Sequence, residues 1–404
     1  MYSSGWSQSE KKRVKLVRIT TVPESLDLLM RGQLGYFRQR GFDVIAISSS
    51  GPQVKLITER EQCQHFAIPF TRKITPIKDI ISLFRLVLLL HKIKPYIVHT
   101  HTPKAGLIGM LASWICRVPV RLHTVAGLPL MEKSGLTKRL LMFTESITYK
   151  CAHKIYPNSI GLLKFMEQHF ITQANKFSLI GKGSTNGIDT DFFSTQAIDT
   201  VLVDSIKARL KLSDDDFVFL FVGRIVKAKG IAELVLAFEK LRLDFPKIQL
   251  MLIGNFETDL DPLDEAIQKI INESNAIKMP GFQTDVRPWF QLAHAFVFPS
   301  YREGLPNVVM QAASMEVPCI VSDINGCNEL IRNDETGWVV PPKNIKELEM
   351  AMRDCYLNPA KRQLFKLSAR NFIKENYQQA VLWRYLEEEY RVQLESSTLF
   401  YNSK

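Results

Sequence analysis

The stretch FVFLFVGRIVKAKG, residues 217–230, decides the fold of the chain. Its six leading apolar residues are typical of a strand that is buried on both faces of a sheet. The strand ends at Gly223, a short basic turn carrying Arg224 and Lys229 follows, and a helix begins at Ile231. A buried strand, a turn and a helix in this order predict one βα unit of a parallel sheet.

The same alternation of apolar runs and helical patterns extends outward in both directions. Parallel sheets that are covered by helices on both faces produce this pattern, and two such sheets in succession predict an α/β fold. We expect two doubly wound, Rossmann-like domains whose parallel sheets face a central cleft. The other strand-like runs are VKLVRIT (14–20), DVIAISS (43–49), YIVHT (96–100), VPVRLHT (118–124), HKIYPNS (153–159), IQLMLIG (248–254), AFVFPS (295–300) and PCIVSD (318–323).

The length of the chain, 404 residues, also favours two domains, because single hydrophobic cores stop growing at roughly 250–300 residues. A polar, glycine-containing segment at 181–196 separates the two series of strands. We therefore expect a first domain over 1–190, with 1–13 flexible, and a second domain over 191–404. The last helix, about 380–396, is expected to pack back across the first domain.

Cysteine usage and hydropathy indicate the compartment. The six cysteines are scattered without a C-x-x-C pair, which is typical of reduced thiols in a cytosolic protein. The longest uncharged apolar run, 105–116, has twelve residues, whereas a spanning helix needs about 20. No apolar run of signal-peptide length follows the first residues. We expect a cytoplasmic protein that binds peripherally to the inner face of the plasma membrane.

The positive charge is concentrated in the first half of the chain. The net charge is +11, but residues 1–190 hold 27 Lys and Arg against 11 Asp and Glu, and residues 191–404 hold 25 against 30. A uniformly basic nucleic-acid binder would not be divided in this way, so we expect no nucleic-acid partner. The division favours an anionic membrane surface as the partner of the first domain. A solvated basic surface without a partner is the alternative.

The segment 135–151 gives the membrane hypothesis a specific helix. Its apolar residues recur at helical spacing among basic residues, and a basic amphipathic helix can lie in a headgroup layer. A helix that turns the same stripe toward the core is the alternative. The apolar residues are Leu136, Leu140, Phe143 and Ile147, and the basic ones are Lys133, Lys138, Arg139, Lys150 and Lys154.

Two segments of the second domain carry chemistry that suits a nucleotide-sugar. The turn with Arg224 and Lys229 delivers two cations and a helix N-terminus to one place, which suits a diphosphate. In PSYREGLPNVVMQAASM (299–315), we expect a helix over 305–315. Glu303, Asn307 and Gln311 recur at every fourth position, so they are expected to line one face that begins at the helix N-terminus. Their carboxylate and amide groups can bind sugar and ribose hydroxyls. Solvated side chains are the alternative in both segments.

Together these motifs resemble the retaining GT-B glycosyltransferases of family 4. The resemblance is strongest to capsule and exopolysaccharide enzymes that extend sugars linked to undecaprenyl diphosphate, and it covers nearly the whole chain. It implies transfer of a hexose or N-acetylhexosamine from a UDP-sugar to a lipid-linked sugar acceptor, with retention and with neither metal nor cofactor. The motifs are TVPESLDLLMRGQL (21–34), VHTHTPKAGLIGML (98–111), RLHTVAGLP (121–129), GRIVKAKG (223–230), DVRPWF (285–290), REGLPNVVMQAA (302–313), DINGCNEL (323–330) and TGWVVPP (336–342).

The resemblance also assigns roles to residues. It implies that Arg224 and Lys229 hold the donor diphosphate, that Glu303 holds the donor sugar, and that the imidazole of His123 lies against that sugar. These four are the expected catalytic residues. The further donor-binding residues are Phe282, Gly304, Leu305, Asn307 and Gln311, and the acceptor side, in the first domain, has His101, Thr102 and Lys104.

The chain departs from the family pattern in two places. The second carboxylate of the E-x7-E motif is replaced by Gln311, whose carbonyl oxygen can still accept hydrogen bonds from ribose. The glycine pair after the first strand is replaced by Pro23, Glu24 and Ser25. The first change bears on donor affinity and the second on acceptor identity.

Three other functions are alternatives to glycosyl transfer. A dehydrogenase needs a G-x-G-x-x-G turn after its first strand, and this chain has none there. A nucleotide-sugar epimerase could use the same two-domain fold. A donor-binding protein without catalysis is the third alternative, since Gln311 alters the family motif.

Overall fold

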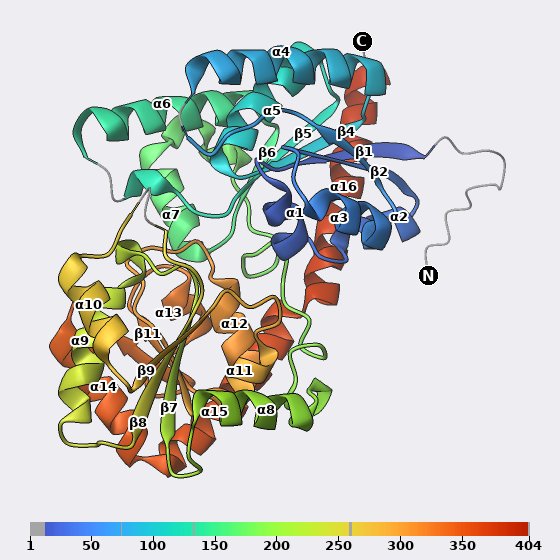
Figure 1. Ribbon diagram of the computed structural model, residues 1–404. Helices are drawn as coiled ribbons and strands as arrows, with labels where there is room; N and C mark the ends of the chain where they lie inside the picture. The colour runs from blue at the N-terminus through green and yellow to red at the C-terminus, as the bar shows by residue number, and fades with distance from the viewer. Residues whose placement is uncertain (1–12, 74, 132–133, 258–260, 403–404) are drawn as a thin grey trace. The chain divides into compact units, whose positions relative to one another are not determined.

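The computed structural model describes residues 13–73, 75–131, 134–257 and 261–402 (Figure 1). The segment 1–12, for which we expected flexibility, lies outside the described residues. The contacts divide the chain into two compact units. The first unit comprises Met1–Pro157, Met166–Ser178 and Trp383–Lys404, and the second comprises Asn158–Phe165 and Leu179–Leu382. The expected ranges, 1–190 and 191–404, were continuous, whereas each unit here is assembled from separate segments.

The first unit is built on a six-stranded parallel sheet in the order β3-β2-β1-β4-β5-β6. The strands are β1 (Val14–Ile19), β2 (Phe42–Ser48), β3 (Gln64–Ala67), β4 (Ile97–His101), β5 (Val120–Val125) and β6 (Lys154–Pro157). The helices are α1 (Pro23–Leu29), α2 (Gln33–Gln39), α3 (Gln53–Glu61), α4 (Pro76–Ile93), α5 (Pro103–Ile115), η1 (Pro129–Met131), α6 (Gly135–Cys151), α7 (Ile160–His169), η2 (Ile171–Lys176) and α16 (Gln379–Asn402), with α7 and α16 shared between the units.

The strand order sets which helices share a face of this sheet. Because crossovers between parallel strands are right-handed, α1, α2 and α3 lie on one face and α4, α5 and α6 on the other (Figure 1). Helix α16 joins the face of α2, where the Tyr36 hydroxyl donates to Glu387 at 2.9 Å and Tyr390 packs on Phe37.

The second unit repeats the design with the order β12-β11-β10-β7-β8-β9, again all parallel. Its strands are β7 (Phe217–Val222), β8 (Ile248–Ile253), β9 (Ile277–Gly281), β10 (Ala295–Phe298), β11 (Cys319–Ser322) and β12 (Gly337–Val340). Its helices are η3 (Thr195–Ala197), α8 (Thr200–Leu210), η4 (Lys227–Lys229), α9 (Ile231–Arg242), α10 (Glu265–Glu273), α11 (Arg287–Leu292), α12 (Asn307–Ser314), α13 (Cys327–Leu330), α14 (Ile345–Leu357) and α15 (Pro359–Tyr377).

The stretch 217–230 lies at the centre of this unit. Strand β7 pairs with both β8 and β10, and Phe219, Leu220 and Phe221 are fully buried in the core. The predicted α/β class with two parallel sheets is confirmed. All six cysteines are free thiols, five of them buried.

Three strands were missing from the sequence prediction: β3, β9 and β12. Each lies at an edge of its sheet. An edge strand has one neighbour and partial solvent exposure, so it does not need a continuous apolar run. Strand β3 illustrates this, because its sequence is QHFA and none of its residues is buried.

Candidate active site

The basic turn after β7 is held against the end of β10 by Gly230. This residue has a φ of 69°, and a Cβ there would lie 2.1 Å from the carbonyl oxygen of Pro299. Only glycine fits such a close approach with a positive φ. The N-terminus of α9 and the segment that follows β10 are therefore brought together at the carboxyl edge of the sheet.

This approach brings together two of the predicted residues. Lys229 forms an ion pair with Oε1 of Glu303, and both side chains are largely shielded, at 18% and 14% exposure. The Ser300 hydroxyl donates to the same carboxylate oxygen at 2.8 Å. The Lys229 ammonium also lies 5.0 Å from the centre of the Phe298 ring. A shielded cation beside a shielded carboxylate, at a helix N-terminus, is an arrangement that can hold a phosphate and a hydroxyl group next to each other.

Arg224 lies on the same turn in a more open environment. Its guanidinium pairs with Glu257, and its side chain is 59% exposed. An exposed ion pair contributes only about 0–1 kcal/mol, so an incoming anion can replace this carboxylate at little cost. The turn itself is fixed by its backbone, since the Ile225 amide donates to the Asn255 carbonyl at 2.9 Å.

Phe282 is connected to the Arg224 turn through Asn255. The Phe282 amide donates to Oδ1 of Asn255 at 3.2 Å, and the aromatic side chain is 61% exposed. The ends of β7, β8 and β9 are thus linked in a row. An exposed aromatic ring at this edge is available to stack on a ligand.

Helix α12 begins later than the sequence pattern suggested. Pro306 is its N-cap residue in an extended conformation, so the helix starts at Asn307. Asn307 and Gln311 share one helical face and are half-buried, but Glu303 lies in the preceding loop. The expected single face of three residues is therefore wrong for Glu303, whose position is set by Ser300 and Lys229 instead.

Gly304 and Leu305 belong to the same loop and are buried, and their backbone lies against Gly326, the residue before α13. A Cβ on Gly326 would lie 2.1 Å from the Gly304 carbonyl oxygen, and Gly326 has a φ of 80°. The amide of Asn325 donates to the carbonyl oxygen of Glu303 at 2.6 Å. The DINGCNEL segment therefore fixes the backbone on which Glu303 is presented.

His123 lies in β5 of the first unit and is buried. Its Nδ1 is 2.8 Å from the Thr100 hydroxyl on β4, and a Cβ on Gly106 would collide with the imidazole at 2.4 Å. Burial lowers the pKa of His123 to about 4, so the ring is neutral at neutral pH. A neutral imidazole can donate or accept a hydrogen bond but carries no charge.

The three residues expected on the acceptor side are engaged within the first unit. His101 accepts from the buried Arg18 guanidinium, 2.9 Å away, and burial holds its pKa well below the usual range. Since a guanidinium can only donate, Nε2 of His101 must be the acceptor. Thr102 has a φ of 72°, and its hydroxyl lies 2.7 Å from that of Thr21.

Lys104 has the largest number of partners of the three. Its ammonium donates to the Thr71 hydroxyl at 2.9 Å, to Asp79 at 2.8 Å and to the Lys73 carbonyl. These bonds hold the segment before α4. An acceptor role for His101, Thr102 and Lys104 stays a prediction.

Both halves of the chain match known protein families. Residues 21–159 match the family model described as glycosyl transferase 4-like, and residues 203–372 match the model described as glycosyl transferases group 1. A capsular polysaccharide biosynthesis glycosyltransferase of Staphylococcus aureus, CapM, is 32% identical over 96% of this chain and 99% of its own length. The chain belongs to the GT-B glycosyltransferases of family 4.

Other relatives of this glycosyltransferase act on named lipid-linked sugars. An Escherichia coli enzyme named UDP-Gal:alpha-D-GlcNAc-diphosphoundecaprenol alpha-1,3-galactosyltransferase is 28% identical over 84% of this chain and 87% of its own length. The crystal structure of Anabaena HepE in complex with UDP and glucose shares the fold, with a TM-score of 0.78, 16% identity, and coverage of 94% of this chain and 100% of that one.

Sequence reasoning did not identify several residues that position the side chains of the candidate site. Ser300 and Asn325 orient Glu303, and Asn255 links the turns. Two of them were within reach, because Ser300 ends the run AFVFPS and Asn325 lies in the motif DINGCNEL. Asn255 follows β8 in a stretch that matched no motif.

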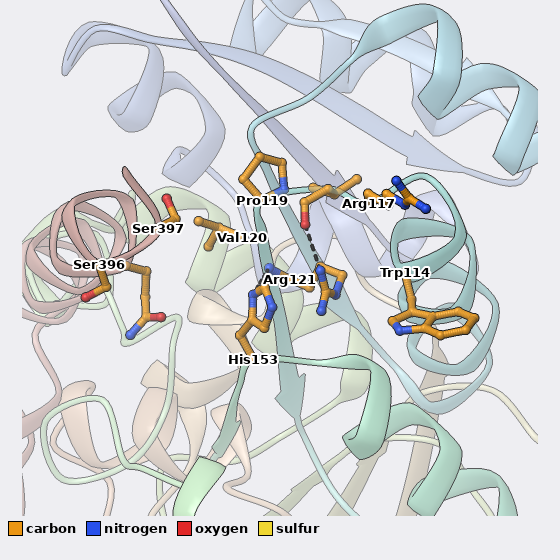
Figure 2. A pocket seen from close by; sticks show the side chains of 10 residues that line it. Trp114, Arg117, Pro119, Val120, Arg121, His153, Ser396 and Ser397 are labelled. Carbon is orange, nitrogen blue, oxygen red and sulfur yellow. Dashed lines mark hydrogen bonds between the residues drawn. The ribbon is translucent and has the colours of Figure 1, made fainter. Parts of the chain in front are cut away.

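A cavity of about 570 Å³ lies elsewhere in the first unit (Figure 2). Its lining residues come from the end of α5, the amino ends of β5 and β6, and α16. Arg121 in its wall is turned to the backbone, donating to the carbonyls of Cys151 at 2.6 Å and Val118 at 2.8 Å. The cavity thus lies at the amino ends of the strands, opposite their carboxyl ends.

Within the described residues, no group of three or more His, Cys, Asp or Glu side chains is arranged to hold a metal ion. Independence of metal stays a prediction that a chelator tests.

Proposed function

We propose that this glycosyltransferase moves a hexose or N-acetylhexosamine from a UDP-sugar to a lipid-linked sugar acceptor, with retention of the anomeric configuration and without a metal ion. The proposal rests above all on the shielded cluster of Lys229, Glu303 and Ser300 at the N-terminus of α9. The name of the Staphylococcus aureus relative supports a role in capsular polysaccharide synthesis, and the name of the Escherichia coli relative supports a lipid-linked acceptor.

The second unit binds the donor in this proposal. Lys229 and Arg224, with the amide groups at the start of α9, bind the diphosphate, and Phe282, Asn307 and Gln311 bind the nucleoside. Gly304 and Leu305 supply the backbone beside the sugar. Glu303 accepts hydrogen bonds from sugar hydroxyls, which requires the carboxylate to exchange part of its contact with Lys229 for the ligand.

The reaction breaks the bond between the anomeric carbon and the diphosphate oxygen. The bonding electrons remain on UDP, where Lys229 and Arg224 stabilise the developing charge in place of a metal ion. The acceptor hydroxyl attacks the anomeric carbon from the same face, and its proton passes to the departing phosphate oxygen. His123, neutral because of its low pKa, contributes a hydrogen bond to the sugar.

A panel of UDP-sugars assayed for nucleotide release, with and without an undecaprenyl-diphosphate-linked sugar, tests the proposal. We expect release with one donor, dependence on the acceptor, and no effect of EDTA. The NMR coupling constant of the new linkage should match that of the donor. Equal release without acceptor, or activity that EDTA abolishes and Mg²⁺ restores, would contradict it. Interconversion of UDP-sugars would indicate an epimerase, and donor binding without turnover would indicate a binding protein.

A further inference from the structure

Helix α4 exposes an apolar stripe that the sequence reasoning had not singled out. The side chains of Ile77, Ile80, Phe84 and Leu88 recur at three- and four-residue spacing and are 56% to 77% exposed. The buried side of the same helix holds Ser82, Leu86, Leu90 and Ile93. A soluble surface rarely keeps such a contiguous apolar stripe in water, so the stripe indicates an interaction surface.

Helix α6 exposes a second group of apolar side chains. It buries Glu145, Thr148, Tyr149 and Cys151 near its C-terminal end, while Leu136, Leu140 and Phe143 are 50% to 81% exposed. The alternative in which this stripe faces the core is therefore wrong for these three residues. Of the predicted stripe, only Ile147 is half-buried.

The two stripes lie on the same face of the first sheet. Helix α5 packs against both α4 and α6 (Figure 1). It contributes the exposed side chains of Trp114 and Ile115. The thiol of Cys116, just after α5, is 3.4 Å from the Val87 carbonyl on α4. We refer to the outer sides of α4, α5 and α6 as the three-helix face.

The charges of the three-helix face have one sign. Its helices contain seven basic residues, Lys78, Arg85, Lys92, Lys104, Lys138, Arg139 and Lys150, and two acidic ones, Asp79 and Glu145. Asp79 is paired with Lys104 at 2.8 Å, and Glu145 is buried. No acidic group of these helices is thus left to offset the other cations. Lys133 and Glu132, just before α6, lie outside the described residues.

We infer that the three-helix face docks on an anionic lipid bilayer, with α4 and α6 inserting their apolar side chains among the headgroups. Apolar side chains for shallow insertion and cations for anionic headgroups are the two components of such binding. A second copy of the chain fits less well, because two such faces would oppose their positive charges. The inference rests on the proposed function, since a lipid-linked acceptor keeps its reacting sugar at the membrane. In the part of the chain that the structure describes, no helix is long and apolar enough to span a bilayer.

Vesicle sedimentation tests the inference. We expect the wild-type protein to bind vesicles that contain phosphatidylglycerol, to bind phosphatidylcholine vesicles poorly, and to be released by 1 M salt, where the Debye length falls to about 3 Å. The double substitution Ile80→Glu with Phe84→Glu should weaken binding at least ~10-fold, because each added carboxylate opposes both insertion and attraction to the lipid. Charge reversal by Lys138→Glu with Arg139→Glu should act in the same direction.

A matched control comes from the opposite face of the same sheet. Leu28 on α1 and Leu56 on α3 are also more than half exposed, so Leu28→Glu with Leu56→Glu makes the same chemical change away from the three-helix face. This variant should bind vesicles within about twofold of wild type, because two added charges away from the lipid have only a small effect on binding.

Trp114 provides a direct signal of docking. The other described tryptophans, Trp289, Trp338 and Trp383, are buried. We therefore expect tryptophan fluorescence to shift to shorter wavelength when the wild-type protein binds vesicles. Loss of this shift in Trp114→Phe would place the three-helix face at the lipid.

Three results would overturn the inference: no binding to anionic vesicles, equal weakening by the substitutions on both faces, or a wild-type dimer that Phe84→Glu dissociates. Turnover of a short soluble acceptor distinguishes failure of the membrane inference from failure of the proposed function. If the inference alone fails, the protein transfers sugar to that acceptor without binding vesicles; if the function alone fails, it binds vesicles but transfers nothing.

Discussion

The two cations of the proposed donor site differ in their surroundings, and this difference makes their proposed roles testable. Lys229 is shielded and paired with Glu303, whereas Arg224 is open and paired with Glu257. Replacing either by alanine should lower kcat/KM at least ~10²-fold, because each substitution removes a charge that stabilises the leaving diphosphate in the proposed mechanism. Steady-state kinetics measure this effect.

Lys227 on the same turn is the control for these variants. Its side chain is half exposed and 3.6 Å from Asp264. Lys227→Ala should keep kcat/KM within a few-fold of wild type. A comparable loss in all three variants would mean that the turn acts only through its general positive charge.

Gln311 tests whether an amide replaces the second carboxylate of the family motif. It lies on the same face of α12 as Asn307 and is half-buried. Gln311→Glu should retain activity. Gln311→Leu should raise the donor KM and leave kcat within a few-fold, since the lost hydrogen bond stabilises the bound donor and the transition state equally. Wild-type donor affinity in the Leu variant would remove Gln311 from the site.

The buried imidazole of His123 links stability to pH. Its pKa is lowered by burial from about 6.5 in the unfolded chain to about 4, so the unfolded chain binds the proton first as the pH falls. The stability that this group contributes is present above pH 6.5 and is lost between pH 6.5 and 4, by about 3 kcal/mol.

Chemical denaturation across this pH range measures the effect. His123→Asn should show a shallower loss of unfolding free energy than wild type, with the other buried histidines still contributing. Parallel pH profiles of the two proteins would show that His123 is not held neutral by the fold.

At the scale of elements, the close approach of Gly230 to Pro299 joins α9 to the end of β10. Gly230→Ala places a Cβ 2.1 Å from a backbone carbonyl at a φ of 69°, so the turn must move. We expect a loss of about 1–3 kcal/mol in stability together with lower activity. Gly281→Ala is the control: its φ is 80°, but the nearest neighbour of its Cβ is 4.0 Å away. If both variants lost the same free energy of unfolding, the positive φ alone would explain the loss, and the close approach to Pro299 would contribute nothing.

Every interior strand could be predicted from the sequence, but of the four edge strands only β6 was, from the run HKIYPNS (153–159). Strand β7 is buried between β8 and β10, so its sequence is apolar throughout and identifies it. Strand β3 has one neighbour and a polar sequence, and only its pairing with β2 makes it a strand. Similarly, the start of α12 depends on the extended backbone of Pro306, which the four-residue periodicity of Glu303, Asn307 and Gln311 does not reveal.

At the scale of the molecule, the sequence shows which half of the chain is basic, but it does not show that α4, α5 and α6 form the three-helix face. Helix α4 is apolar around most of its circumference, so its sequence alone does not tell which side is covered. The structure settles this by burying Leu86 and Leu90 and leaving Ile80 and Phe84 in water. The family motifs, in contrast, singled out Lys229 and Glu303 one by one, because both residues lie in short segments of recognisable spacing. Their ion pair became visible only in the structure.

The central claim is that the Lys229 and Glu303 cluster drives transfer of one sugar to a lipid-linked acceptor. The most direct measurement is mass spectrometry of that acceptor after incubation with a UDP-sugar in EDTA, with wild type and Lys229→Ala side by side. The account predicts that wild type extends the acceptor by one sugar and that Lys229→Ala leaves nearly all of it unchanged. An acceptor of unchanged mass with wild type, while UDP accumulates, would contradict the account.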